Sequence, residues 1–248
     1  MAEKKAVNKV VEPTNEEIDA HVDQLVAKAQ VALSKFEEFT QEQVDYIVAK
    51  CSVAGLDAHG TLAEAAVNET GRGVFEDKAV KNLFACEYVT SNLRHLKTVG
   101  IINEDPLLGI TEIAEPVGVV CGIVPTTNPT STVIFKSLIC LKTRNPIIFS
   151  FHPSAHACSV MAAVVIRDAA IAAGAPEDCI QWLDLKSMYA TTALMKHPGV
   201  ATILATGGNA MVAAAYSCGK PALGVGAGNV PAYVEKTCVL RRAVNDIG

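Results

Sequence analysis

The sequence predicts an α/β fold in which a helical N-terminal region packs on a doubly wound, mostly parallel, Rossmann-like sheet. Half of the 248 residues are hydrophobic and only 5% are aromatic, a balance typical of parallel sheets covered by helices on both faces. Through residues 110–248, short apolar runs alternate with helical patterns, which is how repeated β-α units with right-handed crossovers look in a sequence. A chain of this length can bury a sizeable core.

The N-terminal part, residues 16–100, is predicted to be helical and to serve packing, because it carries no cluster of reactive side chains. Ahead of it, residues 1–15 are polar and are expected to form a flexible leader. Residues 16–35 repeat apolar positions with a 3.6-residue period, and Thr40 with Gln43 three positions on is a capping-box signature for a second helix. Two further helices are expected, at 62–69 and 77–96.

Residues 110–248 are predicted to form the sheet and its crossover helices, so that residues 16–248 make up one domain. The expected strands are 117–124, 146–151, 180–183, 200–205 and 222–225, with a last extended piece at 231–234. The expected helices end at Lys142, Ala173, Lys196 and Ser217.

Several classes of protein and site are disfavoured by the composition. A formal charge of −5 and a pI near 5.7, without a long basic cluster, argue against nucleic-acid binding. No signal peptide or run of 18 apolar residues is found, so a cytosolic protein without a membrane span is expected. The 8 cysteines include no C-x-x-C pair and are expected to be buried, reduced thiols. His152 and His156 lack a third ligand nearby, so no metal site is expected.

Four predicted strand ends carry sequences suited to a ligand. They are "PTTNPTS" (125–131), "FHPSAH" (151–156), "ATGGNA" (205–210) and "GVGAGN" (224–229). Ligands of open parallel sheets bind outside the carboxyl ends of the strands, where glycines and helix N-termini accommodate phosphate groups. Taken alone, "TGGN" is also a sequence for a tight turn or helix cap, and "GVGAGN" is not the G-x-G-x-x-G fingerprint. Together the four segments favour a nucleotide crevice.

Three stretches resemble the aldehyde dehydrogenase superfamily. They are "EPVGVVCGIVPTTNPTSTVIFKSLICLKTRNPIIFSFHPSA", "ILATGG" and "GKPALGVGAGNVP". They are most similar to its CoA-acylating branch, which also forms the N-terminal half of bifunctional aldehyde-alcohol dehydrogenases. "FTQEQVD" and "FEDKAVKN" extend the resemblance into the helical region.

The resemblance implies an NAD site and an oxyanion donor. Asn128 matches the family asparagine that donates its side-chain N–H to the oxyanion of the reaction intermediates; a helix N-cap or Asx-turn ahead of Pro129 is the structural alternative, and both roles can coexist. The family's cofactor site implies binding roles for Ile123, Val124, Pro125, Thr126, Thr127, Asn128, His152, Thr206, Gly207, Gly208 and Gly226. His152 stands where hydrolytic members commonly carry a lysine for the adenine ribose, so the choice between NAD and NADP stays open.

Two departures from the hydrolytic enzymes bear on the reaction. A glutamate base matching "ELGGK" is missing from "GVGAGN", which favours transfer of the acyl group to coenzyme A over hydrolysis, with acetaldehyde and acetyl-CoA as the expected pair. The family's N-G-x-x-C-A-S type stretch with the nucleophilic cysteine is also missing, so the domain is expected to be incomplete at its C-terminus and inactive by itself. Cys238, at an expected helix start, does not match that motif.

Three hypotheses remain from the sequence. The first is the cofactor-binding portion of an NAD-dependent, CoA-acylating aldehyde dehydrogenase, acting on a small aldehyde and forming a homo-oligomer in the full-length protein. The second is a truncated NAD-binding or assembly module without catalysis. The third, an ordinary dehydrogenase that relies on a general acid of this chain, is weakened because no His/Asp pair lies at a predicted strand end.

Overall fold

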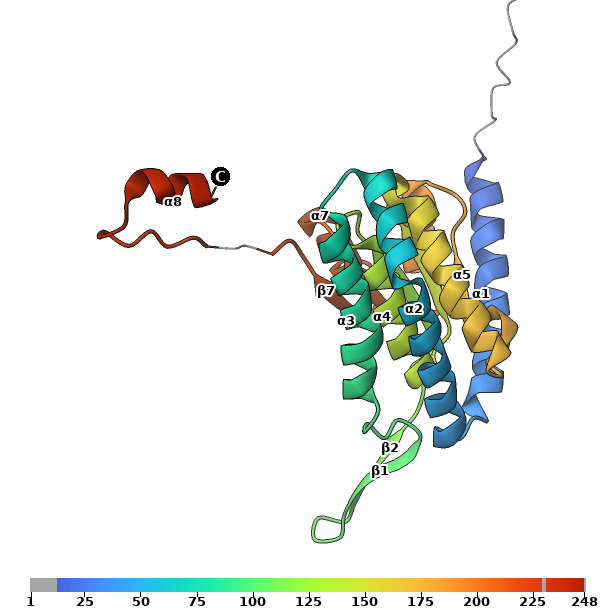
Figure 1. Ribbon diagram of the computed structural model, residues 1–248. Helices are drawn as coiled ribbons and strands as arrows, with labels where there is room; N and C mark the ends of the chain where they lie inside the picture. Colours follow the sequence, from blue (N-terminus) through green and yellow to red (C-terminus); the bar gives the residue numbers. More distant parts are fainter. Residues whose placement is uncertain (1–12, 229–230, 248) are drawn as a thin grey trace, which may run out of the picture.

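The computed structural model describes residues 13–228 and 231–247, which form eight α-helices, a five-stranded sheet and a separate two-stranded hairpin (Figure 1). The α-helices are α1 (Asn15–Glu37), α2 (Gln41–Thr70), α3 (Phe75–Leu93), α4 (Pro129–Lys142), α5 (His156–Ala172), α6 (Met188–Lys196), α7 (Asn209–Tyr216) and α8 (Leu240–Ile247). The strands are β1 (Gly100–Asp105), β2 (Ile110–Ala114), β3 (Val119–Val124), β4 (Ile147–Phe151), β5 (Ile180–Trp182), β6 (Val200–Thr206) and β7 (Ala222–Val225). Two single-turn 3-10 helices, η1 (Pro153–Ala155) and η2 (Glu177–Cys179), precede α5 and β5.

The sheet is parallel throughout, in the order β5-β4-β3-β6-β7, and it is covered on both faces. Residues of α2, α3, α4 and α5 form one core cluster with Val120, Val124 and Phe149. Residues of α1 and α6 form a second cluster with Cys121 and Ile203. Because successive β3 residues enter opposite clusters, both faces of this central strand are buried. The predicted fold class is confirmed.

Helices α1 and α2 begin where side chains bind their free N–H groups. Thr14 and Thr40 are the N-caps, and each forms a reciprocal capping box with the residue three positions on, Glu17 and Gln43. The predicted start of the second helix at Thr40 is therefore confirmed. Most of the predicted leader lies outside the described residues, and Asn15 already belongs to α1.

One predicted boundary is wrong, because 62–69 is the last part of the continuous helix α2. Gly55, within this helix, serves close packing in the structure. A Cβ atom at this residue would lie 2.6 Å from Cys86 Sγ on α3 and 3.3 Å from Ile166 Cδ1 on α5. The glycine thus lets three helices approach, and α3, α2 and α5 run side by side as a layer (Figure 1).

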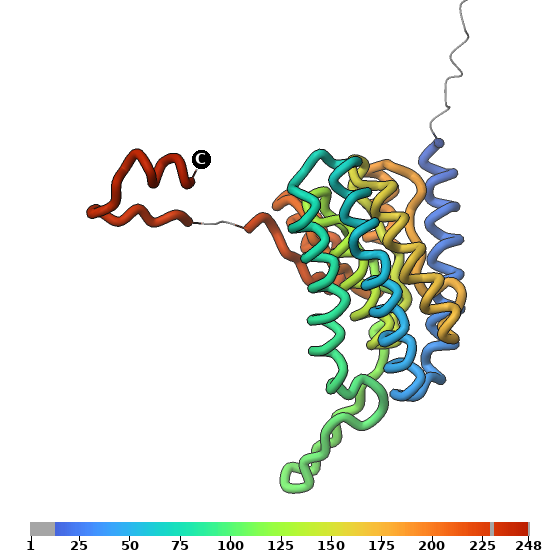
Figure 2. Tube along the Cα trace, viewed as in Figure 1, coloured from blue at the N-terminus to red at the C-terminus, as the bar shows by residue number. Residues whose placement is uncertain are grey.

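Two further differences concern extended segments. The antiparallel hairpin β1–β2, which the sequence analysis did not identify, projects from the helical layer (Figure 2). Its Leu107 and Leu108 are 95% and 71% exposed. In contrast, a last extended piece was expected at residues 231–234, and these residues pair with no described strand. Beyond them, α8 has no buried residue.

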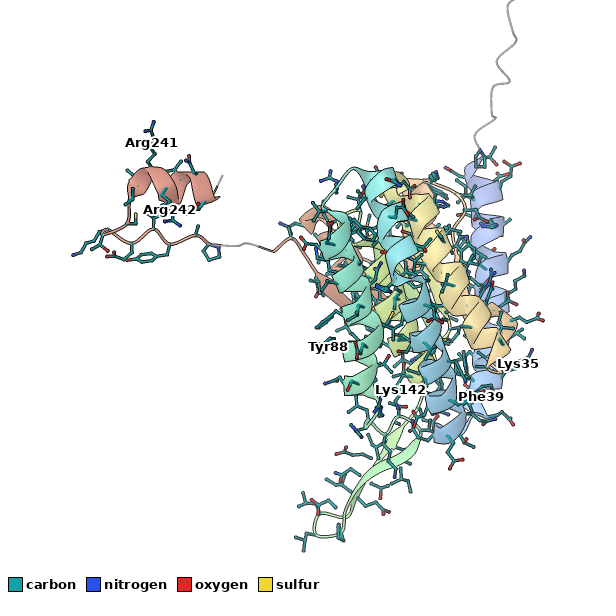
Figure 3. The ribbon with its side chains drawn as sticks, viewed as in Figure 1. Lys35, Phe39, Tyr88, Lys142, Arg241 and Arg242 are labelled. Atoms are coloured by element: carbon teal, nitrogen blue, oxygen red, sulfur yellow. The ribbon has the colours of Figure 1, made fainter. Side chains whose placement is uncertain are left out.

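The base of the hairpin is held by charged side chains from the end of α4. Arg144, 3% exposed, donates from its guanidinium to the carbonyl oxygens of Glu37 and Ala114. Lys142 Nζ binds the Asp45 carboxylate of α2, and its side chain lies where the helical layer meets the hairpin (Figure 3). These contacts join the end of α1, the first part of α2 and the end of β2 to the residues at and just after the end of α4.

One helical segment, Pro153–Ala172, is long and apolar enough to cross a membrane by length and composition among the residues described. In this fold it comprises η1 and α5, which pack against α2 and α4. The core helix of a globular domain meets the same criteria, so this segment has a packing explanation.

We predict opposite effects from alanine at the two glycines inside α2. Gly55→Ala should lower the free energy of unfolding by about 1–3 kcal/mol, because the new methyl group overlaps Cys86. Gly60→Ala should raise it by about 0.5–1 kcal/mol, since its Cβ would meet no atom within 4 Å and alanine favours the helix. Urea unfolding of both variants checks this, and equal effects would contradict the packing role of Gly55.

Candidate functional site

The carboxyl ends of β3, β4, β6 and β7 surround a cavity of about 880 Å³. Every predicted site residue lines it, and these residues come from all four predicted strand ends. They are Ile123, Val124, Pro125, Thr126, Thr127, Asn128, His152, Thr206, Gly207, Gly208 and Gly226. The structure thus brings together segments up to about a hundred positions apart, while Asn229 of the fourth segment lies outside the described residues.

The cavity opens at this place because the strand order reverses there. From β3 the chain moves through β4 to β5 at one edge, then returns to β6 on the other side of β3. The connections that leave β3 and β6 therefore turn away in opposite directions and leave a crevice between them. The loop after β3 carries Asn128, and the loop after β6 carries Gly208.

A buried lysine joins the two strands beneath this crevice. Lys136 of α4 is 2% exposed, and its Nζ donates to the carbonyl oxygens of Ile123 and Leu204, each at 2.6 Å. Burial lowers the pKa of Lys136 to about 7, while the nearby Cys121 and Cys140 act in the opposite direction. The amine thereby fixes the spacing of β3 and β6 where the cavity begins.

Asn128 occupies the N-cap position of α4, but its side chain makes no cap hydrogen bond. Its backbone oxygen accepts from Thr132 N at 3.2 Å, while its side-chain Oδ1 accepts from Lys81 Nζ at 3.1 Å. The amide Nδ2 lies 3.4 Å from Thr127 Oγ1, a long contact. Asn128 is therefore the N-cap residue by its backbone position alone. Its side-chain N–H groups do not cap the helix and are left for another acceptor.

His152 and the start of α5 have protein partners that limit what they can offer a ligand. His152 Nδ1 accepts from Ser154 N at 3.1 Å, which places the proton of the neutral ring on Nε2. The Glu69 carboxylate accepts from Ala157 N and Cys158 N, at 2.9 and 2.7 Å. Burial would raise the pKa of Glu69, but these hydrogen bonds outweigh it and lower the pKa. The N-terminus of α5 is therefore occupied by a protein anion.

The start of α7 is different, because its N-cap is Gly208 and no side chain caps it. A Cβ atom at Gly208 would meet no atom within 4 Å. At Gly226, a Cβ would lie 2.7 Å from Oδ1 of Asn209. Backbone N–H groups here remain accessible to a ligand that enters between Gly208 and Gly226.

Sequence analysis missed the part of the lining that comes from the β5–α6 loop. Leu185, Lys186, Ser187 and Met188 all line the cavity. The available signal was Ser187, a helix N-cap whose Oγ accepts from Tyr189 N at 3.1 Å. Lys186 is the one Lys or Arg of the described lining, which contains no Asp or Glu.

None of the cysteines lines the cavity. All eight are free thiols, and six are buried as expected, whereas Cys218 is half-buried and Cys238 is exposed. Burial raises the pKa of Cys121 and of Cys140 to about 12, which keeps both protonated and confirms their core positions. Cys238 lies two residues before α8 rather than at its start. Among the residues that the structure describes, no group of His, Cys, Asp or Glu could hold a metal ion.

Comparison with known proteins assigns the family. A pattern described as "Aldehyde dehydrogenase family" matches residues 3–247. The chain belongs to the aldehyde dehydrogenase family. It is 71% identical over 232 residues to aldehyde-alcohol dehydrogenase 2 of Entamoeba histolytica, covering 93% of this chain and 27% of that protein. It is 70% identical over 249 residues to the aldehyde-alcohol dehydrogenase of Streptococcus pneumoniae, covering 100% of this chain and 28% of the relative. The chain thus spans about a quarter of these relatives.

Solved structures agree with this assignment. An acetylating aldehyde dehydrogenase from Geobacillus thermoglucosidasius superposes with a TM-score of 0.87 at 46% identity, over 95% of this chain and 52% of that one. A propionaldehyde dehydrogenase from Rhodopseudomonas palustris is described with bound CoA and an acylated cysteine. It superposes with a TM-score of 0.75 at 33% identity, over 91% of this chain and 51% of that one. The family resemblance and the fold class predicted from the sequence are confirmed.

The buried Lys136 should make stability depend on pH in a defined direction. Its pKa falls from 10.5 to about 7 on folding, so within this window the unfolded chain binds more protons at this side chain than the folded chain does. The contribution of Lys136 to the free energy of unfolding therefore rises with pH. The free energy of unfolding is measured with urea for the wild type and for Lys136→Met. We expect the wild-type value minus the variant's value to increase from about pH 7 to about pH 9.

The matched control is the same replacement by Met at Lys50 of α2, which is exposed rather than buried. If the difference in the free energy of unfolding between the wild type and Lys136→Met stays constant over this pH range, the lowered pKa of Lys136 is contradicted.

Proposed function

We propose that this chain is the cofactor-binding portion of an NAD-dependent, CoA-acylating aldehyde dehydrogenase, which converts acetaldehyde, CoA and NAD to acetyl-CoA and NADH. The observation that carries this proposal is the cavity at the β3/β6 reversal, lined by the whole set of residues that the family resemblance assigns to the site. Relatives named as acetylating enzymes support the same reaction class. A cytosolic location remains a prediction from composition.

The cavity suits a dinucleotide in size and chemistry. Its volume of about 880 Å³ falls within the range of small-molecule sites, and its described lining contains no carboxylate to repel phosphate. The uncapped start of α7 with Gly207, Gly208 and Gly226 would hold the pyrophosphate. Residues 123–128 would lie along the nicotinamide side, and His152 would meet the adenosine ribose. When bound, NAD supplies the hydride acceptor that aldehyde oxidation requires.

Whether NAD or NADP is preferred is not fixed by these residues. NAD-specific dinucleotide sites often present a carboxylate to the ribose hydroxyls, and the described lining has none. An engineered glycolyl-CoA reductase, 32% identical, is described with bound NADP+. We retain NAD as the proposed cofactor from the family resemblance.

Asn128 would stabilise the charge that develops on the substrate oxygen. Its Nδ2 makes only one long contact within the protein, so an N–H remains for an oxyanion. Removing one such preorganised donor raises the barrier by about 3 kcal/mol in comparable sites. This role makes Asn128 the one proposed catalytic residue of the chain.

The lining also favours an acyl acceptor other than water. Hydrolysis of an acyl-enzyme needs a base to remove a proton from water, and the described lining offers no Asp or Glu for this task. A thioester at the nucleophilic cysteine would then persist until the CoA sulfur attacks its carbonyl carbon and the enzyme thiolate leaves. Coenzyme A and a small aldehyde are the proposed substrates.

A second candidate function, NAD binding or assembly without catalysis, is favoured by one observation. No cysteine lines the cavity, so the described residues offer no thiol as nucleophile. We propose that the nucleophile belongs to another part of the complete enzyme and that this chain is inactive by itself.

The exposed Leu107 and Leu108 of the hairpin support the proposed homo-oligomer, because apolar loop ends of this kind mark protein contacts.

Side chains of increasing size at Gly208 should weaken NAD binding progressively. Gly208 has an ordinary extended backbone and free space around the position of a Cβ, so Ala and Val should leave the fold intact. Calorimetry on the purified chain should show weaker binding for Gly208→Ala and at least about a tenfold loss for Gly208→Val. Gly60→Ala on α2 is the control, and unchanged affinity in Gly208→Val would place the nucleotide elsewhere.

Turnover separates the two candidate functions. We expect no NADH formation from acetaldehyde, CoA and NAD with the 248-residue chain alone. Joined to the remainder of the pneumococcal relative, the same residues should yield NADH and acetyl-CoA together. NAD binding without turnover in this complete chimaera, with the intact relative active in parallel, would favour the non-catalytic module.

A further inference from the structure

One face of α3 binds the loop that carries Asn128. Lys78 Nζ donates to the carbonyl oxygen of Thr127 at 2.9 Å, and Lys81 Nζ donates to Asn128 Oδ1 at 3.1 Å. Asn82 Oδ1 accepts from the hydroxyl of Thr130 at 2.8 Å. Positions three and four apart share a helix face, so Lys78, Lys81 and Asn82 act on the same loop.

Two of the three α3 side chains in these contacts are buried, whereas the contact of Lys81 with Asn128 is exposed. Lys78 is 5% exposed and Asn82 is fully buried. Burial lowers the pKa of Lys78, and the charge of Lys81 lowers it further. Asn82 uses both ends of its amide, because its Nδ2 also donates to His59 O at 2.9 Å. The loop is therefore held by hydrogen bonds with buried side chains on both sides of Asn128.

The Lys81 contact also decides which way the Asn128 amide points. An ammonium only donates, so it can be paired with Oδ1 and not with Nδ2. With Oδ1 held by α3, the amide nitrogen, which is bonded to the same Cγ atom, must lie on the opposite side of the Cβ–Cγ bond axis. A cation on the oxygen also polarises the amide and strengthens its N–H groups as donors.

We propose that Lys81 is a positioning residue for the oxyanion donor, which fixes the orientation of the Asn128 amide and increases its strength as a donor. This inference rests on the proposed function of Asn128. It gives α3 a role in the reaction beyond packing. Lys81 itself does not line the cavity and acts only through Asn128.

The contact can be tested in the chain itself by NMR of the asparagine side-chain amides. Lys81→Met should shift the Asn128 Nδ2 resonances, whereas Lys50→Met, at an exposed lysine of α2, should leave them in place. Lys81→Arg should restore most of the wild-type position, because a guanidinium also donates to an oxygen. Unchanged Asn128 resonances in Lys81→Met would overturn the inference.

The catalytic consequence is tested in the chimaera with the remainder of the pneumococcal relative. Lys81→Met should lower kcat about tenfold, less than loss of the donor itself, and should change KM for NAD by less than about twofold. Lys81→Arg should retain most of the rate. In the Asn128→Ala background, Lys81→Met should have no further effect, because its only route to the reaction has been removed.

The outcomes separate this inference from the proposed function. If Asn128→Ala lowers kcat but Lys81→Met does not, Lys81 has no positioning role and the proposed function stands. If Asn128→Ala leaves kcat unchanged, both the oxyanion assignment and the role of Lys81 are wrong. Additive losses in the double variant would indicate a general structural effect of Lys81 and would overturn the inference.

Discussion

The reversal of strand order between β3 and β6 is the constraint on which the site depends. Strands that continued in one direction would place every connecting loop over its neighbour and leave no gap at this edge. Here the chain returns across β3, and the loops after β3 and β6 separate. The Lys136 amine holds the two strands together from below through Ile123 O and Leu204 O. A buried lysine thus links the two neighbouring strands beneath the crevice.

The same reversal explains how polar groups are distributed around the cavity. The start of α5 is occupied by the Glu69 carboxylate, whereas the start of α7 is capped by no side chain. Between these two helix N-termini, an anionic ligand is therefore directed to that of α7. The helical layer contributes in two ways, because α2 supplies Glu69 and α3 supplies the lysines that hold the Asn128 loop.

Local signals in the sequence were sufficient for most of the fold. Thr40 and Gln43 predict a helix start because a capping box needs only two residues three positions apart. The buried strands are recognised because they are continuous apolar runs. The division of α2 ahead of Leu62 was wrong, and the packing role of Gly55 could not be predicted, since it comes from Cys86 and Ile166, which are distant in sequence. The hairpin was missed because its apolar residues are exposed and have no buried face to set a pattern.

The candidate site shows the same division between local and distant information. Residues 123–128 and the glycines after β6 and β7 could be predicted because family motifs and strand ends coincide there. The Leu185–Met188 loop carries no motif, and it reaches the cavity only because α6 packs beside β6. Likewise, "EDKAVKN" looked like a packing helix until the fold placed Lys81 against Asn128.

We propose that the strand ends at the β3/β6 reversal form one nucleotide site. The most direct measurement is a titration of the 15N-labelled 248-residue chain with NAD, followed by the shifts of its backbone amides. We expect the largest shifts at residues 123–128, at Thr206–Gly208 and at Gly226. Little change is expected in a second, smaller groove, which lies between α1 and α6. Shifts centred on that groove around Asp23 and His197, or no saturable shifts at the strand ends, would contradict it.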